Sequence, residues 1–248
     1  MPYSEQTVRS VRPWSNRTFS FTLSRPQDFA FENGEFVTLG LKREGKLVAR
    51  AYSIVSTPDR DYLEFLSIHM PDGPLTSQLV RIRPGDSVWV NSKATGSLTL
   101  NHVLPGRTLY MLASGTGLAP FMSLIRDPEL YARYEHVVLV HSVRTAAELA
   151  YRDEIEALAD AKLHYVPTVT REPFPTPQRG SDLFRSGELS QRLGLPAPDP
   201  AQDRVMVCGN PDMTRELTRH LKDAGWTPTN HRGIGNFTTE LAFVVHHE

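Results

Sequence analysis

Short alternating runs dominate the first hundred residues of the chain. Apolar, β-branched and aromatic residues alternate with polar ones over residues 18–23, 36–41, 47–54, 62–69 and 87–91. Turn-forming residues separate these runs, including Gly34, Gly45 and the Pro84-Gly85-Asp86 segment. Closely spaced strands with such turns predict a small antiparallel β-barrel, and one short helix is expected over residues 75–81.

The pattern changes from residue 108 onward. Apolar runs without alternation occupy residues 108–113, 137–141, 163–169 and 205–208, and helical stretches occupy residues 146–161 and 213–224. Buried strands that alternate with helices are typical of a parallel sheet covered on both faces. We therefore expect a β-barrel domain over residues 1–101 and an α/β domain over residues 102–248, divided within the polar stretch near residues 99–106.

Composition restricts the class of protein. The 248 residues are 40% hydrophobic, which is enough for ordinary cores, and the net charge of -1 disfavours a nucleic-acid binder. No apolar run approaches the ~20 residues of a membrane helix, and no export signal is visible, so we expect a soluble, cytoplasmic protein without a membrane partner. The single cysteine, Cys208, excludes an internal disulfide and a cysteine-ligated iron–sulfur cluster, which takes about four thiolates.

A four-residue motif, Arg50-Ala51-Tyr52-Ser53, closes one apolar run of the predicted barrel. It offers a cation, a flat aromatic ring and a hydroxyl along one strand. These groups suit a phosphate, an isoalloxazine ring and a flavin nitrogen respectively. The alternative interpretation is an ordinary barrel strand that ends in a proline turn.

A second motif, Gly115-Thr116-Gly117-Leu118-Ala119-Pro120, lies between a predicted strand and a predicted helix. Glycines let the backbone approach a ligand closely, and a helix N-terminus favours anions. The two motifs together indicate a flavin site followed by a nicotinamide site.

With these motifs in this order, the chain resembles the ferredoxin–NADP reductase superfamily, and most closely its bacterial ferredoxin or flavodoxin reductases. The resemblance also rests on Gly73-Pro74-Leu75-Thr76-Ser77 and Cys208-Gly209-Asn210-Pro211, so it covers almost the whole chain. It implies an N-terminal antiparallel FAD-binding β-barrel followed by a parallel-sheet, Rossmann-like NADP-binding domain. The implied cofactors are FAD and NADP(H).

The resemblance assigns the first motif to the flavin. It implies that Arg50 contacts the FAD pyrophosphate with Ala51 beside it, that Tyr52 packs on the isoalloxazine, and that Ser53 hydrogen-bonds near flavin N5. The resemblance also implies that the start of a short helix, Leu75, Thr76 and Ser77, holds the flavin phosphates. It implies that Ser67, Ile68 and His69 lie on a strand that flanks the flavin.

The same resemblance places Thr116 next to both the flavin and the nicotinamide, with Cys208 facing the same point. A cysteine at the end of a buried strand is otherwise an inert core residue. Nothing basic beside Cys208 in the sequence would activate its thiol, so we do not expect a covalent nucleophile. The loop that Cys208 opens continues through Gly209, Asn210, Pro211 and Asp212, of which Asp212 either contacts the cofactor or caps a helix.

Arginines follow two of the predicted parallel strands, where an NAD site would usually offer a carboxylate to the adenosine ribose. Arg144 and Thr145 follow one strand, Thr170 and Arg171 follow the next, and Arg179 comes later. Guanidinium groups accept a 2'-phosphate, so we predict a preference for NADP. The alternative is that these arginines are solvated loop charges.

The C-terminal residues depart from the family pattern. The resemblance implies that Ala242 lies over the flavin face and Phe243 on the FAD adenine. The adjacent His246 and His247 would point apart on an extended tail, so we predict no metal site there.

The implied activity is electron transfer between NADPH, which gives two electrons as a hydride, and a one-electron carrier, ferredoxin or flavodoxin. The protein's part is placement and tuning of the cofactor, so no catalytic base is needed.

We expect a monomer. The first hundred residues carry 12 basic and 10 acidic side chains, and an acidic carrier would suit basic residues there. The candidates are Arg9, Arg12, Arg17, Lys42, Arg43 and Lys46.

Two other functions remain open at this point. A reductase that feeds an oxygenase or reduces free flavin shares the two-domain plan, although many such proteins carry a fused four-cysteine domain that this chain lacks. A flavin-holding interaction or sensor module without turnover is the non-enzymatic alternative. Such a module would be recognised by bound FAD that NADPH cannot reduce.

Overall fold

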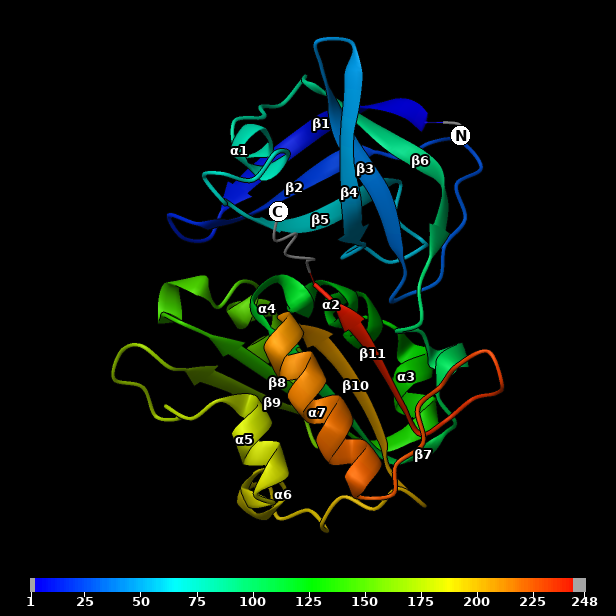
Figure 1. Cartoon of the computed structure of the whole chain (residues 1–248), viewed down its shortest axis with the longest axis vertical. Coiled ribbons are helices and arrows are strands. Elements are labelled where there is room, and N and C mark those ends of the chain that lie inside the picture. The colour runs from blue at the N-terminus through cyan, green and yellow to red at the C-terminus, as the bar shows by residue number, and fades with distance from the viewer. Residues whose placement is uncertain (1–2, 243–248) are drawn as a thin grey trace.

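The computed structural model describes residues 3–242, and in Figure 1 it shows an antiparallel barrel above a parallel sheet. The barrel strands have the order β4-β3-β6-β1-β2-β5, and all neighbouring pairs are antiparallel. A bridge between Ile54, which directly follows β4, and Phe65 in the middle of β5 joins the two outer strands, so the sheet closes as predicted. The strands are β1 (Tyr3–Pro13), β2 (Thr18–Ser24), β3 (Phe36–Arg43), β4 (Lys46–Ser53), β5 (Tyr62–Ile68) and β6 (Ser87–Thr95).

Strand β1 has no counterpart in the sequence prediction. Only Gln6 and Val8 are buried in it, because most of its side chains are polar and face solvent. No run of apolar residues therefore marks it. Strands β2 to β5 begin and end within two residues of the predicted runs, whereas β6 continues to Thr95.

The predicted helix over residues 75–81 is shorter in the structure, where α1 spans Thr76–Leu79. The next two backbone bonds run from Arg81 N to Gln78 O and from Ile82 N to Leu79 O. These three-residue steps tighten the last turn and end the helix. Leu79 is fully buried, so the helix packs onto the barrel core through this side chain.

The second sheet has the strand order β11-β10-β7-β8-β9, and every neighbouring pair is parallel. This confirms the predicted parallel sheet. Its edge strand β11 was not predicted, because it is short and only Phe237 and Thr238 of its five residues are buried. The strands are β7 (Gly106–Ser114), β8 (Tyr134–Val143), β9 (Leu163–Val169), β10 (Arg204–Gly209) and β11 (Phe237–Leu241).

Helices cover both faces of the parallel sheet. One face packs against Phe121, Leu130 and Ile155, and barrel residues Val55 and Leu66 join this same core cluster. The other face packs against helices that contribute residues such as Leu183 and Leu217. The helices are α2 (Ala119–Ile125), α3 (Pro128–Arg133), α4 (Arg152–Leu158), α5 (Gly180–Arg185), α6 (Glu188–Arg192) and α7 (Pro211–Asp223).

The single helix predicted over residues 146–161 is wrong. A 3-10 turn over Ala146–Glu148 comes first, α4 begins only at Arg152, and Tyr151 between them is left-handed with φ of 59°. Thr145 and Glu148 form a capping box that closes the first turn on itself. The break turns Tyr151 toward the barrel, where its hydroxyl donates to Glu64 Oε1 at 2.8 Å.

The barrel and the parallel sheet are joined by the segment between β6 and β7, which contains a 3-10 turn over Leu100–His102. The predicted domain boundary between residues 101 and 102 falls in this segment and stays a prediction. Within residues 3–242 there is no helix with the length and apolar character needed to cross a membrane.

Candidate active site between the barrel and the parallel sheet

Tyr52 lies near the end of β4 with its ring against the barrel core. The ring makes edge contacts with Phe21 and Phe65 at centroid distances of 6.4 Å, and its hydroxyl lies 3.2 Å from the Oγ of buried Ser67. Burial raises the pKa of Tyr52, although the Ser67 hydrogen bond and the Arg50 charge oppose this. The ring is therefore a neutral, fixed aromatic surface.

Arg50 lies on the same face of β4 as Tyr52, because side chains two residues apart on a strand share a face. It is exposed, and one of its NH groups donates to Ala49 O at 2.8 Å. Within residues 3–242 it forms no ion pair, so its other donors suit the oxygens of a pyrophosphate. Ala51 and Ser53 point to the opposite face, so the motif does not present one continuous surface.

The other predicted barrel residues lie at the end of β5, directly after it and at the start of α1. Ser67 and Ile68 end β5, and the backbone N–H of His69 donates to Arg17 O at 2.6 Å, which continues the ladder toward β2. Thr76 donates its hydroxyl to Met70 O at 3.2 Å, while Leu75 is buried. The hydroxyl of Thr76 therefore stabilises the turn itself. Contacts of Leu75, Thr76 and Ser77 with flavin phosphates stay predictions.

The glycine motif forms a 3-10 turn, Gly115–Leu118, directly after β7 and before α2. Gly117 touches the backbone carbonyl of Cys208, and a Cβ atom at position 117 would overlap that oxygen. Gly115 has φ of 55°, which favours glycine, and no atom lies within 4 Å of where its Cβ would be. The turn therefore packs on one side and is open to a ligand on the other, with Thr116 between the two glycines.

His141 supports this turn from β8. Its Nε2–H donates to Gly115 O at 3.0 Å, and its Nδ1 has no hydrogen-bond partner among the described residues. The ring is fully buried, and burial lowers the pKa of His141 to about 4 despite the bond to Gly115. His141 is therefore neutral near pH 7.

Cys208 and Asn210 lie beside the same turn. Cys208 is 1% exposed, and burial together with the nearby Glu240 charge raises the pKa of its thiol. That Cys208 is no covalent nucleophile stays a prediction. The backbone N–H of Asn210 donates to Ser114 Oγ at 3.0 Å, while Asn210 Oδ1 caps α7 by accepting from Met213 N at 2.9 Å. Pro211 is the first residue of that helix.

The C-terminal strand closes the site. The backbone N–H of Ala242 donates to Gly209 O at 2.9 Å, so Ala242 lies next to the loop that Cys208 opens. Phe243, His246 and His247 lie outside the described residues. Glu240 is paired with Cys208 across β11 and β10, and its carboxylate accepts from the N–H and, at 3.0 Å, from the Oγ of Ser97. Burial raises the pKa of Glu240, against the lowering effect of these bonds.

The predicted 2'-phosphate arginines meet at the carboxyl ends of β8 and β9. The backbone N–H of Arg171 donates to Arg144 O at 2.9 Å, and Gly180 beside Arg179 donates its N–H to Ser142 Oγ at 2.9 Å. All three arginine side chains are exposed. The salt bridges found within residues 3–242 include none of the three. The structure thus brings together three cations with donors available to an anion.

Neighbours of these arginines have structural contacts of their own. Thr145 belongs to the capping box with Glu148, and Thr170 donates its hydroxyl to Val143 O at 3.3 Å. Asp212 pairs with Arg215 in the first turn of α7, whereas the residue that caps this helix is Asn210. Cofactor contacts of these three residues stay predictions.

Four residues that contact the proposed site or the boundary between the two sheets were not singled out from the sequence: Ser114, Arg126, His141 and Glu240. Three of them could have been noticed from their places in the chain. Ser114 directly precedes the glycine motif, His141 ends a predicted strand, and Glu240 lies two residues before Ala242. Arg126 carries no such signal, because its partners are far away in the sequence.

Family models define the class of the protein. The model described as "Oxidoreductase FAD-binding domain" matches residues 7–97, and the one described as "Oxidoreductase NAD-binding domain" matches residues 111–219. The first match covers most of the barrel and the second covers four of the five parallel strands. The chain is thus a two-part flavin and nicotinamide oxidoreductase, as the motifs indicate.

Individual relatives narrow this class. A ferredoxin–NADP reductase of Pseudomonas aeruginosa is 46% identical over 98% of this chain and 98% of that protein, and one of Azotobacter vinelandii is 46% identical over 96% and 97%. A ferredoxin NADP+ reductase from Neisseria gonorrhoeae, solved with bound FAD and NADP, is 31% identical and superposes with a TM-score of 0.93 over 98% of this chain and 100% of that one. The chain belongs to the ferredoxin–NADP reductase family, and its predicted cofactors are confirmed.

Proposed function

We propose that this chain is an FAD-dependent reductase that passes electrons between NADPH and a one-electron carrier, ferredoxin or flavodoxin. One observation carries the proposal. The end of β4 with Tyr52 and Ser53, the Gly115–Leu118 turn and the Gly209–Ala242 contact all lie where the barrel faces the carboxyl ends of β7 and β10. Ligands of open parallel sheets bind at such strand ends.

The protein's own residues bind and orient in this function. Arg50 neutralises phosphate charge, and the fixed ring of Tyr52 gives the isoalloxazine a flat contact surface. Ser53 and Thr116 orient the two reacting rings from opposite sides of the site. Bound FAD supplies the redox chemistry, since it takes two electrons from NADPH and gives them up singly. The neutral His141 and the buried Cys208 hold the turn and exchange no proton near pH 7.

The preference for NADPH over NADH rests on Arg144, Arg171 and Arg179. Guanidinium groups bind a phosphate through two parallel hydrogen bonds, and the three cations lie together at the carboxyl ends of β8 and β9. Residues 141–145 and 168–171 contain no acidic side chain, and the nearby carboxylates of Glu148 and Glu172 accept backbone N–H groups of Arg144 and Ala146. The adenosine 2'-phosphate is therefore the group that this site selects.

The carrier is proposed from the names and chemistry of the relatives. A protein of Rhodobacter capsulatus that is 42% identical over 96% of this chain is named a flavodoxin/ferredoxin–NADP reductase. Arg12 and Lys42 are exposed on the barrel, each stacked on a tryptophan ring, and would attract an acidic carrier.

We propose further that the enzyme acts in the cytoplasm as a monomer. Light scattering of the holoenzyme would test its oligomeric state.

Carrier reduction tests this function. Purified holoenzyme is mixed with NADPH and, in separate reactions, with a ferredoxin, a flavodoxin or free FMN, and cytochrome c reports the electrons released. We expect ferredoxin or flavodoxin to support a rate at least tenfold above that of free FMN. Equal rates with all three would instead favour a free-flavin reductase, and no rate with any of them would favour the sensor alternative.

A further inference from the structure

We propose that Arg126 is a positioning residue that fixes the flavin half of the active site relative to the nicotinamide half. The inference rests on the proposed function. The two halves belong to different sheets, with Tyr52 and Ser53 on the barrel and Thr116 and Cys208 on the parallel sheet. Electron transfer as hydride requires the reacting atoms to approach within about 3 to 3.5 Å. Contacts that hold the two sheets in one arrangement therefore set the rate.

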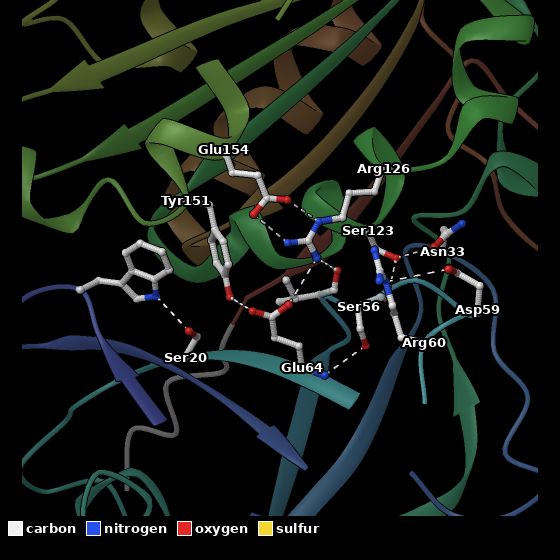
Figure 2. Close-up of polar contacts among 12 residues, drawn as sticks. Ser20, Asn33, Ser56, Asp59, Arg60, Glu64, Ser123, Arg126, Tyr151 and Glu154 are labelled. Carbon is white, nitrogen blue, oxygen red and sulfur yellow. Dashed lines mark hydrogen bonds and ion pairs between the residues drawn. The ribbon is translucent and has the colours of Figure 1, made fainter. Parts of the chain in front are cut away.

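Arg126 reaches across the boundary between the sheets. It follows the last residue of α2, and one NH group donates to the backbone carbonyl of Val55 at 2.9 Å and lies 3.3 Å from Glu64 Oε2. Val55 and Glu64 belong to the barrel. The rest of the guanidinium forms a fork with Glu154, at 2.7 Å from Nε and 3.0 Å from the second NH group. Figure 2 shows the guanidinium between Glu154 and Glu64.

The link is short on both sides. Val55 comes two residues after Ser53, the predicted N5 contact. On the other side, α2 begins directly after the Gly115–Leu118 turn that contains Thr116, and Arg126 directly follows its last residue. The bond between Arg126 and Val55 therefore joins the strand end that carries Ser53 to the rigid helix that extends from Thr116.

Neighbouring contacts hold the partners of Arg126 in place. Tyr151 donates its hydroxyl to Glu64 at 2.8 Å, and its ring lies 4.7 Å from the ring of barrel residue Trp14. Ser123, one turn earlier in α2, lies 3.1 Å from Ser56 O, so the helix touches two consecutive barrel carbonyls. The side chains of Arg126 and Glu64 are only 20% and 14% exposed, so water competes little for these bonds.

The guanidinium geometry is essential to this role. Arg126 serves a carbonyl and two carboxylates at once because its planar fork presents five donors in fixed directions. A glutamine in its place would leave the Glu64 carboxylate without a cation, and its shorter side chain would reach the Val55 carbonyl less well. A displacement of about 1 Å at the reacting atoms can cost a hundredfold in rate, even from a substitution outside the chemical site.

The test compares Arg126→Gln with a matched control, Arg192→Gln. Arg192 also pairs with a glutamate, Glu188, but lies on α6, and its hydrogen bonds go to that side chain. In each holoenzyme, spin labels are attached at Ser92→Cys on β6 and Arg219→Cys on α7, two exposed positions, while Cys208 is buried and stays unlabelled. Pulsed dipolar spectroscopy then gives the distance distribution between the two sheets, independently of activity.

We expect R126Q to broaden or shift this distribution and to lower the rate constant of flavin reduction at saturating NADPH by about tenfold to a hundredfold. The Kd of NADP+ and the FAD content should change by less than threefold, because no residue that touches either cofactor is altered. R192Q should leave all four quantities unchanged. If R126Q does not fold, Arg126→Lys, which keeps the charge but loses the fork, is measured in the same way.

An unchanged distance distribution in R126Q would overturn the proposal. A changed distribution with an unchanged reduction rate would also overturn it, because the link would then not position the reacting groups. A wild-type flavin that NADPH fails to reduce would refute the proposed function instead, while the distance measurement would still report on the link.

Discussion

Gly117 lies directly against the backbone carbonyl of Cys208, and this contact joins the turn after β7 to the end of β10. Both strands end at the proposed nicotinamide site, so this contact sets how closely the turn approaches the end of β10. Only a glycine leaves room for the carbonyl oxygen at this position. The turn is thus set by packing as much as by its backbone angles.

We expect Gly117→Ala to move this turn away from Cys208. The overpacking should lower the free energy of unfolding by about 1 to 3 kcal/mol and weaken NADP+ binding measured by spectral titration. Gly45→Ala is the matched control, because Gly45 at the β3–β4 turn has φ of 76° and open space around it. The free energy of unfolding of the Gly45→Ala variant should fall by a similar amount because of backbone strain, while its affinity for NADP+ should stay the same. Equal NADP+ affinity in both variants would contradict this account of the turn.

Local sequence pattern predicted the elements that local interactions determine. The alternation of residues 18–23 and 62–69 and the unbroken apolar runs of β7 to β10 follow from burial of one or both faces of a sheet. The backbones of Arg144 and Arg171 lie side by side, because the carboxyl ends of adjacent parallel strands lie together, while convergence of their guanidinium groups on one phosphate stays a prediction.

Long-range contacts could not be predicted in this way. Arg126 and Val55 are 71 positions apart, and Glu240 and Ser97 are 143 apart, so no local pattern links them. The helix predicted over residues 146–161 failed for the same reason. Tyr151 adopts a left-handed conformation, and contacts with Trp14 and Glu64 in the barrel compensate for its strain.

The arginine cluster should determine the choice of dinucleotide. Removing a charged hydrogen bond costs about 1.5 to 3 kcal/mol, so Arg144→Gln and Arg171→Gln should each raise the Kd of NADP+ roughly tenfold to a hundredfold. The Kd of NAD+, which lacks the 2'-phosphate, should stay the same. Spectral titration of both nucleotides measures this, with the exposed Arg219→Gln on α7 as the control. A parallel loss of NAD+ affinity would show that the arginines act on another part of the nucleotide.

His141 should make the folded protein sensitive to acid. The unfolded side chain takes up a proton near pH 6.5, whereas burial lowers the pKa of His141 in the folded protein to about 4. Protons therefore favour the unfolded state between these values, and stability is lost as the pH falls. From the two pKa values, the free energy of unfolding should fall by about 2 kcal/mol between pH 7.5 and pH 5.

Urea denaturation of wild type and His141→Gln at the two pH values isolates this contribution. Glutamine can keep the bond to Gly115 O but does not titrate. The raised pKa of Glu240 changes the stability with pH in the opposite direction, but it does so in both proteins. The contribution of His141 is therefore the difference between the two proteins in how their free energies of unfolding change with pH. The same pH dependence in both proteins would contradict the assignment to His141.

Cys208 should be unreactive in the folded holoenzyme. Burial leaves it 1% exposed and raises the pKa of its thiol, so little thiolate is present at pH 8. A disulfide reagent should label no thiol in the native protein and one thiol per chain after denaturation. Rapid labelling of the native protein would show that the strand end opens far more than the structure indicates.

Anaerobic reduction of the bound flavin tests the central claim most directly. The visible spectrum of the holoenzyme is followed in a stopped-flow instrument after mixing with NADPH and, separately, with NADH. We expect NADPH to bleach the flavin rapidly and NADH to do so at least tenfold more slowly at equal concentration. A flavin that stays oxidised with NADPH would contradict the assignment of this chain as a reductase.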